Sequence, residues 1–357
     1  MKQINSYQST VFIGEDVFEY LEEILKSKFT DTSKKIILVD TNTLQHCLPV
    51  LINNVPILND AEILEVESGE DSKSFEILSG LIEALADMNA NRKSLLLNLG
   101  GGVISDLGGL LASLYKRGIN YINVPTSLLA MADASVGGKV AVNVNHIKNI
   151  AGVFNPPQFV FINPVFLQTL DEREYLSGYA EIIKHALIYS KEHWNLLKSS
   201  NLFLIENWTE LLYKSVSIKN DIVLKDPLEN NERKLLNLGH TIGHGIESLM
   251  MDKGMPVTHG EAVAAGILIE SRIALEHGLL NSDDFNSLQE IITKYYSKVA
   301  ILNDDIDNLI SYLYNDKKNE NDAISFVLLS EIGKAHINKT ASIEQIKAAL
   351  EFYIKLD

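Results

Sequence analysis

Short runs of aliphatic and β-branched residues alternate with longer stretches of helical apolar spacing across residues 1–170. The predicted strands are residues 35–40, 63–66, 94–98, 119–124 and 159–162. The run at 94–98 is nearly continuous in apolar residues, which is typical of a strand covered on both faces. Helical spacing occupies residues 17–29, 73–89 and 106–116. The alternation predicts an α/β domain with a doubly wound parallel sheet, a Rossmann-like fold.

After residue 170 the pattern becomes mainly helical. The predicted helices are residues 171–190, 206–224, 232–251, 258–277 and 342–355, and residues 324–329 and 335–338 have the pattern of strands. Thr258 precedes Glu261, and Ser342 precedes Gln345, at the spacing of a capping box. We therefore predict two domains, an α/β domain over 1–170 and a mainly α-helical domain over 171–357, with the active site in the cleft between them.

The composition argues against several classes of protein. With 357 residues and 46% hydrophobic content, the chain is long enough to form two folded cores. A net charge of −16, with no basic tail to offset it, argues against a nucleic-acid partner or an anionic membrane. The N-terminus lacks the apolar core of a signal peptide, and the single cysteine, Cys47, is typical of a reducing compartment. We expect a cytoplasmic enzyme that meets any anionic substrate with a local cluster of cations.

Three histidines, His240, His244 and His259, lie close together in the sequence. His240 and His244 are four residues apart, so on a helix they share a face, and this spacing suits a divalent metal. The capping box at Thr258 places His259 in the first turn of a helix. Spacing alone favours His240 and His244 as metal ligands, and it leaves open the alternative that the spacing arose by chance.

Gly100, Gly101 and Gly102 follow a predicted buried strand and precede a helix, so backbone amides and a helix N-terminus are available to a pyrophosphate. The segment departs from the Gly-x-Gly-x-x-Gly pattern, because Ser105 occupies the place of the third glycine. A purely structural turn is the alternative. Asp40 ends the first predicted strand, where it either binds ribose hydroxyls or caps a helix.

The loop over residues 125–139 carries Thr126, Ser127 and Asp133, and it ends in Gly-Gly-Lys at Lys139. A solvated loop explains the polar residues, but it does not explain a glycine pair followed by a lysine. This ending is typical of a segment whose backbone approaches an anion closely. The loop therefore indicates a second contact with an anionic group.

Several short motifs occur in a definite order along the chain. They are Gly69-Glu70-x-x-Lys73, Gly100-Gly-Gly-Val-x-x-Asp106, Lys116-Arg117-Gly118, Pro125-Thr-Ser-Leu-Leu-Ala130, Asp133-Ala-Ser-Val-Gly-Gly-Lys139, Lys148-Asn149, Ala180-Glu-Ile-Ile-Lys184, Arg233-x-x-x-Asn237-x-Gly-His-Thr-x-Gly-His244 and His259-Gly-Glu-Ala262. The ordered set resembles the 3-dehydroquinate synthase family of sugar phosphate cyclases over residues 40–334.

The resemblance implies a phosphorylated sugar acid, 3-deoxy-D-arabino-heptulosonate 7-phosphate, as substrate, and 3-dehydroquinate and phosphate as products of this shikimate-pathway step. It implies NAD as a regenerated cofactor, through transient oxidation, phosphate elimination, re-reduction and intramolecular aldol closure. The implied metal ligands are Glu181, His240 and His259, with Zn²⁺ as the expected metal and Co²⁺ as the alternative. His244 is then a catalytic group near the phosphate and not a ligand.

The other implied site residues are cationic, polar or glycine. Implied substrate and catalytic contacts, besides His244, are Lys139, Lys148, Asn149, Lys184, Lys219, Arg233, Asn237 and Lys334. Implied cofactor contacts are Asp40, Asn42, Glu70, Lys73, Gly101, Gly102, Val103, Asp106, Thr126, Ser127, Asp133, Lys139, Lys148 and Thr169. Arg117 matches an arginine that reaches the phosphate from a neighbouring subunit, so the resemblance also implies a homodimer.

Some positions depart from the usual pattern of the family, and Ile147 stands where a glycine is common. The closest alternative is a sugar phosphate cyclase that acts on a different sugar. A metal-dependent polyol dehydrogenase of related fold would release NADH, and it does not need so many cations directed at a phosphate. A non-catalytic NAD-binding protein is expected to lack at least one ligand or catalytic group, and this chain has them all.

Overall fold

The computed structural model describes residues 1–144, 147–315 and 324–356. The chain forms two compact units. The first consists of Met1–Asp171 and Asn207–Pro227, and the second of Glu172–Glu206 and Leu228–Asp357. The domain boundary at residue 170 stays a prediction. A single boundary there does not describe residues 207–227, which belong to the first unit. Among the described residues, no helix is long and apolar enough to cross a lipid bilayer.

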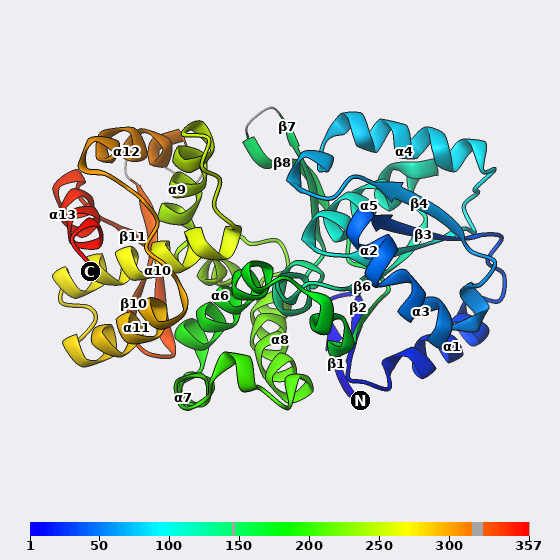
Figure 1. Cartoon of the computed structure of the whole chain (residues 1–357), viewed down its shortest axis with the longest axis horizontal. Helices are drawn as coiled ribbons and strands as arrows, with labels where there is room; N and C mark the ends of the chain where they lie inside the picture. Colours follow the sequence, from blue (N-terminus) through cyan, green and yellow to red (C-terminus); the bar gives the residue numbers. More distant parts are fainter. Residues whose placement is uncertain (145–146, 316–323, 357) are drawn as a thin grey trace. The chain divides into compact units, whose positions relative to one another are not determined.

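The first unit is built on a seven-stranded sheet in the order β1-β2-β9-β6-β5-β3-β4 (Figure 1). Apart from the antiparallel pair β1 and β2, neighbouring strands are parallel, which confirms the predicted parallel sheet. Every residue of β5 is buried, as its apolar run predicts. The sequence pattern did not predict the β1–β2 hairpin. The strands are β1 (Lys2–Ser6), β2 (Ser9–Ile13), β3 (Lys35–Asp40), β4 (Glu62–Val66), β5 (Leu95–Gly100), β6 (Asn120–Pro125) and β9 (Phe159–Ile162).

Helices connect these strands and complete the core of the first unit. One core lies where α4 and α5 pack on β3, β4 and β5, through residues such as Leu81, Leu107 and Leu96. Because α2 follows β3 and α5 follows β5 directly, the first turns of both helices lie at the carboxyl ends of parallel strands, where nucleotides bind in such folds. The helices are α1 (Val17–Lys28), α2 (Thr41–His46), α3 (Leu48–Asn54), α4 (Phe75–Asp87), α5 (Gly102–Leu114) and, from later in the chain, α8 (Trp208–Lys225).

A separate antiparallel hairpin, β7 (Lys139–Val144) and β8 (Ile147–Phe154), follows the loop after β6. Asn143 joins this hairpin to the rest of the unit, because its backbone N–H donates to the carbonyl oxygen of Lys73 at 2.8 Å. The hairpin thereby holds predicted substrate residues beside the segment after β4. The side chain of Ile147 lies outside the described part of the structure, so its departure from the family pattern stays untested.

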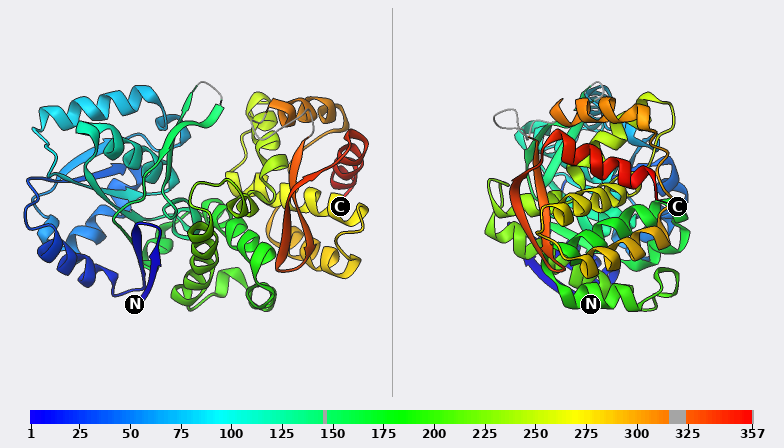
Figure 2. Two further views of the ribbon diagram at one scale, coloured as in Figure 1. Left: turned by 180° about the vertical axis from the view of Figure 1, so that it is seen from behind. Right: turned by 90° about the vertical axis from the view of Figure 1, so that its left-hand side faces the viewer.

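The second unit is mainly helical, as predicted. α10 is its central helix and contacts α6, α9, α11, α13 and β10 (Figure 2). The capping boxes predicted at Thr258 and Ser342 are both present. The elements are α6 (Glu172–Tyr189), α7 (Lys191–Ser199), α9 (His240–Asp252), α10 (His259–Glu276), α11 (Ser282–Tyr295), α12 (Ile306–Asn315), α13 (Ile343–Ile354) and the hairpin β10 (Ser325–Glu331) and β11 (Lys334–Thr340).

The predicted helix 232–251 is wrong in its first part. Residues Glu232–Asn237 form a short 3-10 helix, η7, and α9 begins only at His240. Gly239 lies between them at φ +79°, in the left-handed region that favours glycine. A Cβ there would lie 2.5 Å from Cγ1 of Ile267 and 2.8 Å from the carbonyl oxygen of Val263. The close packing on α10 therefore admits only glycine at position 239, and α9 begins at the next residue, His240.

Candidate active site

Two helices of the second unit begin with a histidine, and both imidazoles face one carboxylate. His240 is the first residue of α9, and His259 is the first residue of α10. Nε2 of His240 lies 3.6 Å from Oε1 of Glu181, and Nε2 of His259 lies 3.3 Å from the same oxygen. Glu181 is fully buried within α6. The three ligand atoms lie within 4.8 Å of one another, so the fold brings together the three implied ligands.

Each imidazole is oriented by a contact at its other nitrogen. Nδ1 of His240 lies 3.1 Å from the carbonyl oxygen of Leu238, and Nδ1 of His259 lies 3.4 Å from Oε1 of Glu247. In the neutral form of each ring, an Nδ1–H that donates to these oxygens leaves the Nε2 lone pair available to a metal on the side of Glu181. Sequence reasoning missed Glu247, although it stands seven residues after His240 and therefore on the same face of α9.

The charges around the two imidazoles differ. Burial, and then the positive charge of Lys184, holds the pKa of His240 well below its usual value. Burial also opposes protonation of His259, but hydrogen bonds with Glu181 and Glu247 raise its pKa to about 10. Without a metal the proton is therefore on His259, and a divalent cation must displace that proton in order to bind.

Lys184 stands one helical turn after Glu181 on α6, and it is only 1% exposed. Its ammonium group contacts Oε2 of Glu181. Buried charges are stable when they are paired in this way, and the contact leaves Oε1 directed at the two imidazoles. The fold therefore places Lys184 directly beside the three implied ligands.

His244 lies one turn after His240 on α9, but it does not join the ligand group. Its ring centroid is 5.5 Å from that of His240 and 6.4 Å from that of His259. Within the described residues, the converging ligand atoms that include a histidine of this cluster belong to Glu181, His240 and His259, and His244 is not among them. The fold therefore does not assemble the pair of ligands that spacing alone favoured.

Arg233 and Asn237 lie on η7, immediately before α9. Arg233 is 1% exposed, which is unusual for a guanidinium. Nδ2 of Asn237 donates to Oε1 of Glu229 at 2.9 Å, and Glu229 has a left-handed backbone at φ +60°. Sequence reasoning missed Glu229, because it lies before the motif that begins at Arg233.

The glycine segment of the first unit forms the turn from β5 into α5. Gly101 is the N-cap of α5 and has no side chain that competes for the first amides of the helix. A Cβ on Gly101 would lie 3.3 Å from Oγ of Ser127, and the backbone N–H of Thr126 donates to the carbonyl oxygen of Gly100 at 3.0 Å. Amides at a helix N-terminus, with the hydroxyl of Ser127 beside them, suit a phosphate group.

Lys73 is the centre of a polar network in the first unit. Its Nζ lies 2.5 Å from Oδ2 of Asp106 and 2.5 Å from Oδ1 of Asn149. Asn143 donates to Oε1 of Glu70 at 2.8 Å and accepts from the backbone N–H of Asn149 at 2.8 Å. Burial raises the pKa of Asp106, and the charge of Lys73 opposes this shift. The predicted cofactor residue Lys73 therefore contacts the predicted substrate residue Asn149 directly, and Glu70 is linked to Asn149 through the unpredicted Asn143.

Lys219 reaches the same unit from α8. Its Nζ lies 2.8 Å from Oδ1 of Asp133 and donates to the carbonyl oxygen of Asp133 at 2.6 Å. Lys219 is 5% exposed. The return of α8 to the first unit therefore pairs a predicted substrate residue with a predicted cofactor residue that is 86 positions away in the sequence.

Asp40 forms the helix cap that was the structural alternative for this residue. Its Oδ1 accepts from the backbone N–H of Thr43 at 2.8 Å, and its own N–H donates to Oγ1 of Thr43 at 2.9 Å. Asn42 is exposed in the first turn of the same helix. Contact of Asp40 and Asn42 with ribose hydroxyls stays a prediction.

Three further predicted residues, Lys334, Thr169 and Arg117, lie at exposed positions. Lys334 begins β11, its side chain is 61% exposed, and its Nζ lies 3.7 Å from Oε1 of Glu331. Oγ1 of Thr169 donates to the carbonyl oxygen of Phe166 at 3.5 Å. Arg117 is exposed in the turn after α5. The fold therefore does not place Lys334 among the buried cations Lys184 and Arg233.

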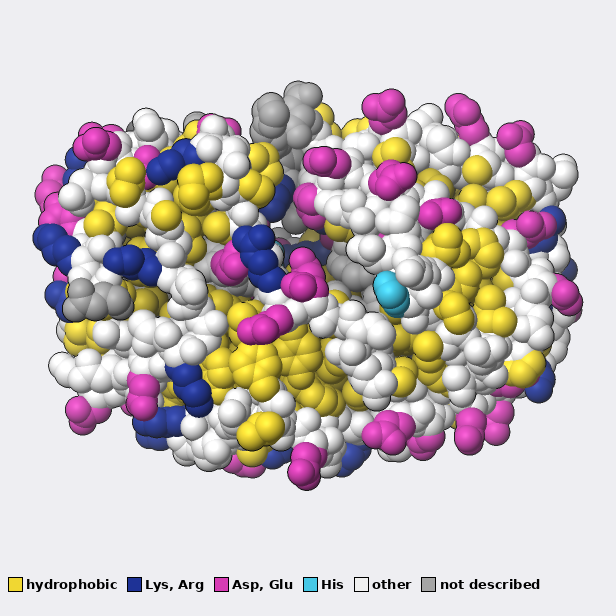
Figure 3. All heavy atoms as spheres, in the orientation of Figure 1, with side chains coloured by type: hydrophobic (Ala, Val, Ile, Leu, Met, Phe, Trp, Pro, Cys, Tyr) yellow, Lys and Arg dark blue, Asp and Glu magenta, His cyan; other side chains and the backbone are white. Residues whose placement is uncertain are grey.

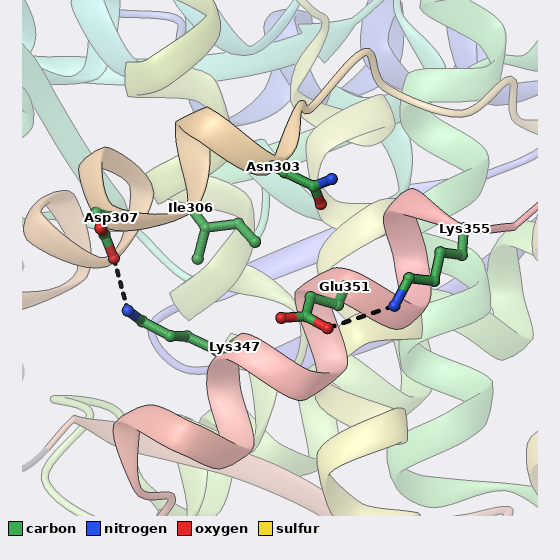
Figure 4. A pocket seen from close by; sticks show the side chains of 6 residues that line it. All are labelled: Asn303, Ile306, Asp307, Lys347, Glu351 and Lys355. Carbon is green, nitrogen blue, oxygen red and sulfur yellow. Dashed lines mark hydrogen bonds and ion pairs between the residues drawn. The ribbon is translucent and has the colours of Figure 1, made fainter.

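The surface ion pairs and the surface hollow of the second unit are weaker candidates for a binding site than the histidine cluster. Lys347 pairs with Asp307 at 2.7 Å, and Lys355 pairs with Glu351 at 3.4 Å, so these charges are matched. The face drawn in Figure 3 carries many acidic side chains, in agreement with the net charge of −16. The ion pairs Lys347–Asp307 and Glu351–Lys355 line a hollow of about 370 Å³ (Figure 4). Its lining residues are Asn303, Ile306, Asp307, Lys347, Glu351 and Lys355.

Known proteins resemble this chain across both units. Family models described as 3-dehydroquinate synthase N-terminal and 3-dehydroquinate synthase C-terminal match residues 63–177 and 178–319. The 3-dehydroquinate synthase of Parabacteroides distasonis is 42% identical over 97% of this chain and 98% of its own length. That of Clostridium beijerinckii is 40% identical, over 79% and 80%. A structure of 2-deoxy-scyllo-inosose synthase, complexed with carbaglucose-6-phosphate, NAD⁺ and Co²⁺, has a TM-score of 0.87 and 26% identity, covering 98% of this chain and 99% of that one.

Proposed function

Because the chain belongs to the 3-dehydroquinate synthase family, we infer that it converts 3-deoxy-D-arabino-heptulosonate 7-phosphate to 3-dehydroquinate and phosphate. It is a carbon–oxygen lyase that eliminates phosphate. The observation that carries this proposal is the convergence of Glu181, His240 and His259 on one point, beside the buried ammonium of Lys184. Family membership predicts such a cluster, and the fold supplies one.

We assign Glu181, His240 and His259 as the ligands of a divalent metal, with Zn²⁺ expected and Co²⁺ as the alternative. One carboxylate and two imidazoles suit Zn²⁺, and three protein ligands leave a position open. Ligand atoms about 2.1 Å from a tetrahedral ion stand about 3.4 Å apart. The N–O distances of 3.3 and 3.6 Å in this cluster fit that separation. When bound, such a metal supplies a Lewis acid that polarises an oxygen of the substrate.

The buried cations of the second unit are assigned to the anionic substrate. Lys184 and Arg233 are each 1% exposed, and both match substrate contacts of the family. We assign the phosphate end to Arg233, Asn237 and His244, because an imidazole placed near a phosphate can serve as a general acid or base. In the first unit, Lys139, Lys148, Asn149 and Lys219 remain proposed substrate contacts. Lys334 has the least support, because it is exposed.

We assign NAD to the carboxyl edge of the sheet in the first unit. The first amides of α5, at Gly102 and Val103, suit the pyrophosphate, the hydroxyl of Ser127 lies beside this turn, and Thr126 is assigned as a further contact. Asp40 and Asn42 are assigned to the sugar hydroxyls, and Glu70, Lys73, Asp106, Asp133 and Thr169 to further cofactor contacts. When bound, NAD supplies a hydride acceptor that is regenerated within one turnover. The structure of 2-deoxy-scyllo-inosose synthase with NAD⁺ and Co²⁺ supports both assignments.

We propose a homodimer in which Arg117 reaches the phosphate of the neighbouring subunit. Arg117 is at φ +67° and Lys116 is at φ +48°. Successive non-glycine residues in the left-handed region are strained, and such strain is retained mainly where it serves a function. An exposed guanidinium on a strained turn supports a contact outside its own subunit.

The direct test of this function is phosphate release from the heptulosonate phosphate with catalytic NAD and Zn²⁺, with NADH absorbance followed in the same cuvette. We expect many phosphates per NAD and no accumulation of NADH. Steady build-up of NADH would indicate a polyol dehydrogenase instead. Release of phosphate from a different sugar phosphate only would indicate another cyclase.

A further inference from the structure

Two buried carboxylates lie behind the histidine cluster, one on each helix that begins with a histidine. Glu247 on α9 is 6% exposed, and Glu270 on α10 is fully buried. Each carboxylate contacts the opposite helix, because Glu247 reaches His259 on α10 and Glu270 reaches the start of α9. The two contacts form a reciprocal brace between α9 and α10.

Glu270 acts on the backbone at the start of α9. Its Oε2 accepts from the N–H of Gly239 at 2.7 Å, and its Oε1 accepts from the N–H of Ile242 at 3.1 Å. These amides belong to the positive end of the helix and have no acceptor within it, so a carboxylate from another element stabilises them. Gly239 stands between Leu238 and His240. The contact therefore holds both the imidazole of His240 and the carbonyl oxygen that accepts from its Nδ1.

The backbones of α9 and α10 meet one turn before Glu270. A Cβ on Gly266 would lie 2.0 Å from the carbonyl oxygen of Gly239 and 2.9 Å from the amide nitrogen of Gly243. No flexible side chain separates the two helices at this point, so a shift in the start of α9 passes directly to His240. Glu270 is therefore placed where a small displacement of the helix changes the position of a ligand.

Glu247 acts on a ring and not on the backbone. Its Oε1 lies 3.4 Å from Nδ1 of His259, whose Nε2 faces Glu181 at 3.3 Å. A carboxylate on the far nitrogen fixes the ring orientation and makes the near nitrogen a stronger electron donor. The corresponding acceptor for His240 is a neutral carbonyl oxygen. The two imidazoles are therefore supported in different ways.

Joining two helices through two buried carboxylates is energetically unfavourable. Burial of a charge costs several kcal/mol, and a well-packed apolar replacement is often equally stable. Contacts of this kind are therefore weak evidence for stability, and their value lies in the geometry that they impose. Both contacts here end at a histidine or at the backbone beside one.

We propose that Glu247 and Glu270 are positioning residues that hold His259 and His240 in the orientation that a metal requires. The proposal rests on the metal site assigned above. Glu247 sets the orientation and donor strength of one imidazole, and Glu270 sets the start of the helix that carries the other.

For Glu247 the test is titration of metal-free protein with Co²⁺, followed by its d–d absorption and by competition with a chelating indicator. Glu247→Ala is expected to weaken Co²⁺ binding by roughly 10–100-fold and to shift the absorption spectrum. Glu247→Gln keeps an acceptor oxygen without the charge, so it should recover part of the affinity. The matched control is Asp252→Asn, since Asp252 is exposed on the same helix and its carboxylate contacts the hydroxyl of Tyr312. The control should leave both readouts unchanged.

For Glu270 the same titration is made on Glu270→Gln, with far-UV circular dichroism as the check of folding. The amide nitrogen of the introduced glutamine would face a backbone N–H, so one of the two hydrogen bonds to the start of α9 would be lost. Co²⁺ should therefore bind more weakly and with an altered spectrum. Where this variant does not fold, Glu270→Asp keeps the charge with a shorter reach and is measured instead. Glu276→Gln on the same helix is the control. Glu276 pairs with Arg272 at a distance of 3.0 Å, and this pair does not contact the histidines of the cluster.

Glu181→Gln and His240→Ala serve as reference variants that separate this proposal from the metal assignment. If both reference variants keep normal Co²⁺ binding, the metal site itself is wrong and the positioning proposal fails with it. If both lose Co²⁺ while the Glu247 and Glu270 variants bind it with unchanged affinity and spectrum, the positioning proposal alone is overturned. Weaker binding with an altered spectrum in both sets supports it.

Discussion

The histidine cluster of the second unit and the nucleotide edge of the first are built in different ways. Glu181 is buried within a helix, and His240 and His259 each begin one, so the proposed ligands lie on regular elements. In the first unit, Lys73 lies on the segment before α4 and Asn149 on a hairpin, and the glycine turn offers backbone amides. Side chains on helices define the histidine cluster of the second unit, whereas backbone amides and loops define much of the nucleotide edge of the first unit.

The difference follows from what each site is proposed to bind. A metal requires donor atoms at fixed separations, so each ligand needs further contacts that fix its orientation. A nucleotide is long, and its contacts are spread over amides, hydroxyls and charges along one edge of a sheet. Single changes should therefore abolish metal binding in the second unit, whereas changes in the first unit should have graded effects.

The largest expected effect is that of His259→Ala. Removal of a ligand should cost more than the roughly 10–100-fold that an outer contact is worth, so metal and turnover should be lost together. Metal content by atomic absorption and phosphate release are the measurements. His277→Ala, at the other end of α10, is the control. Normal metal content in the His259 variant would remove it from the ligand set.

Lys73→Met should destabilise the first unit strongly, because it leaves the carboxylate of Asp106 without its ammonium partner. The loss of a partner from a buried pair costs about 3–5 kcal/mol, measured as the free energy of unfolding in urea. Adding Asp106→Asn should recover much of this loss. The exposed pair Lys34 and Glu62, at 3.3 Å, is the control, and Lys34→Met should cost less than about 1 kcal/mol. Equal losses for both lysines would show that Lys73 is not a buried anchor.

Arg117→Ala tests whether a third set of contacts comes from the neighbouring subunit. We expect a roughly 100-fold loss of turnover, the scale of one preorganised donor. Mixed dimers with a subunit that is inactive through His259→Ala should regain activity, because one site then has both its ligands and its arginine. Absence of rescue would mean that Arg117 serves its own subunit.

The smallest expected effect is at Asp40, where capping and cofactor binding are separable. Asp40→Ala removes the cap of α2 and should cost about 1 kcal/mol of stability. Asp40→Asn keeps a good capping group without the charge, so the stability should remain close to that of the unchanged protein. Weaker NAD binding in the Asn variant, measured by calorimetry, would support the ribose contact. Unchanged NAD binding would leave Asp40 as a helix cap only.

Local patterns predicted much of the fold. The apolar run of β5, the capping boxes at Thr258 and Ser342, and the alternation over residues 1–170 all depend on neighbours in sequence, and the structure confirms them. The start of α9 was predicted wrongly, because Gly239 is dictated by contact with α10, which no local pattern contains. The position of His240 at the start of α9 therefore depends on contacts between helices.

The same distinction applies to the candidate site. The ligand set came from ordered motifs, since four-residue spacing favoured His244, which the fold leaves outside the group. Glu247 was accessible from the sequence, because it shares a helical face with His240. The contacts of Lys219 with Asp133 and of Asn143 with Glu70 depend on the return of α8 and on the hairpin, so periodicity had no means of predicting them.

The proposed metal ligands and the proposed NAD contacts are separate sets of residues, so each should bind without the other. The most direct test is to remove the metal with a chelator and then to measure NAD affinity and phosphate release on the same sample. We predict that phosphate release is lost and returns with Zn²⁺, while the Kd for NAD stays unchanged. Loss of NAD binding together with the metal would contradict this account, as would full activity in the chelated enzyme.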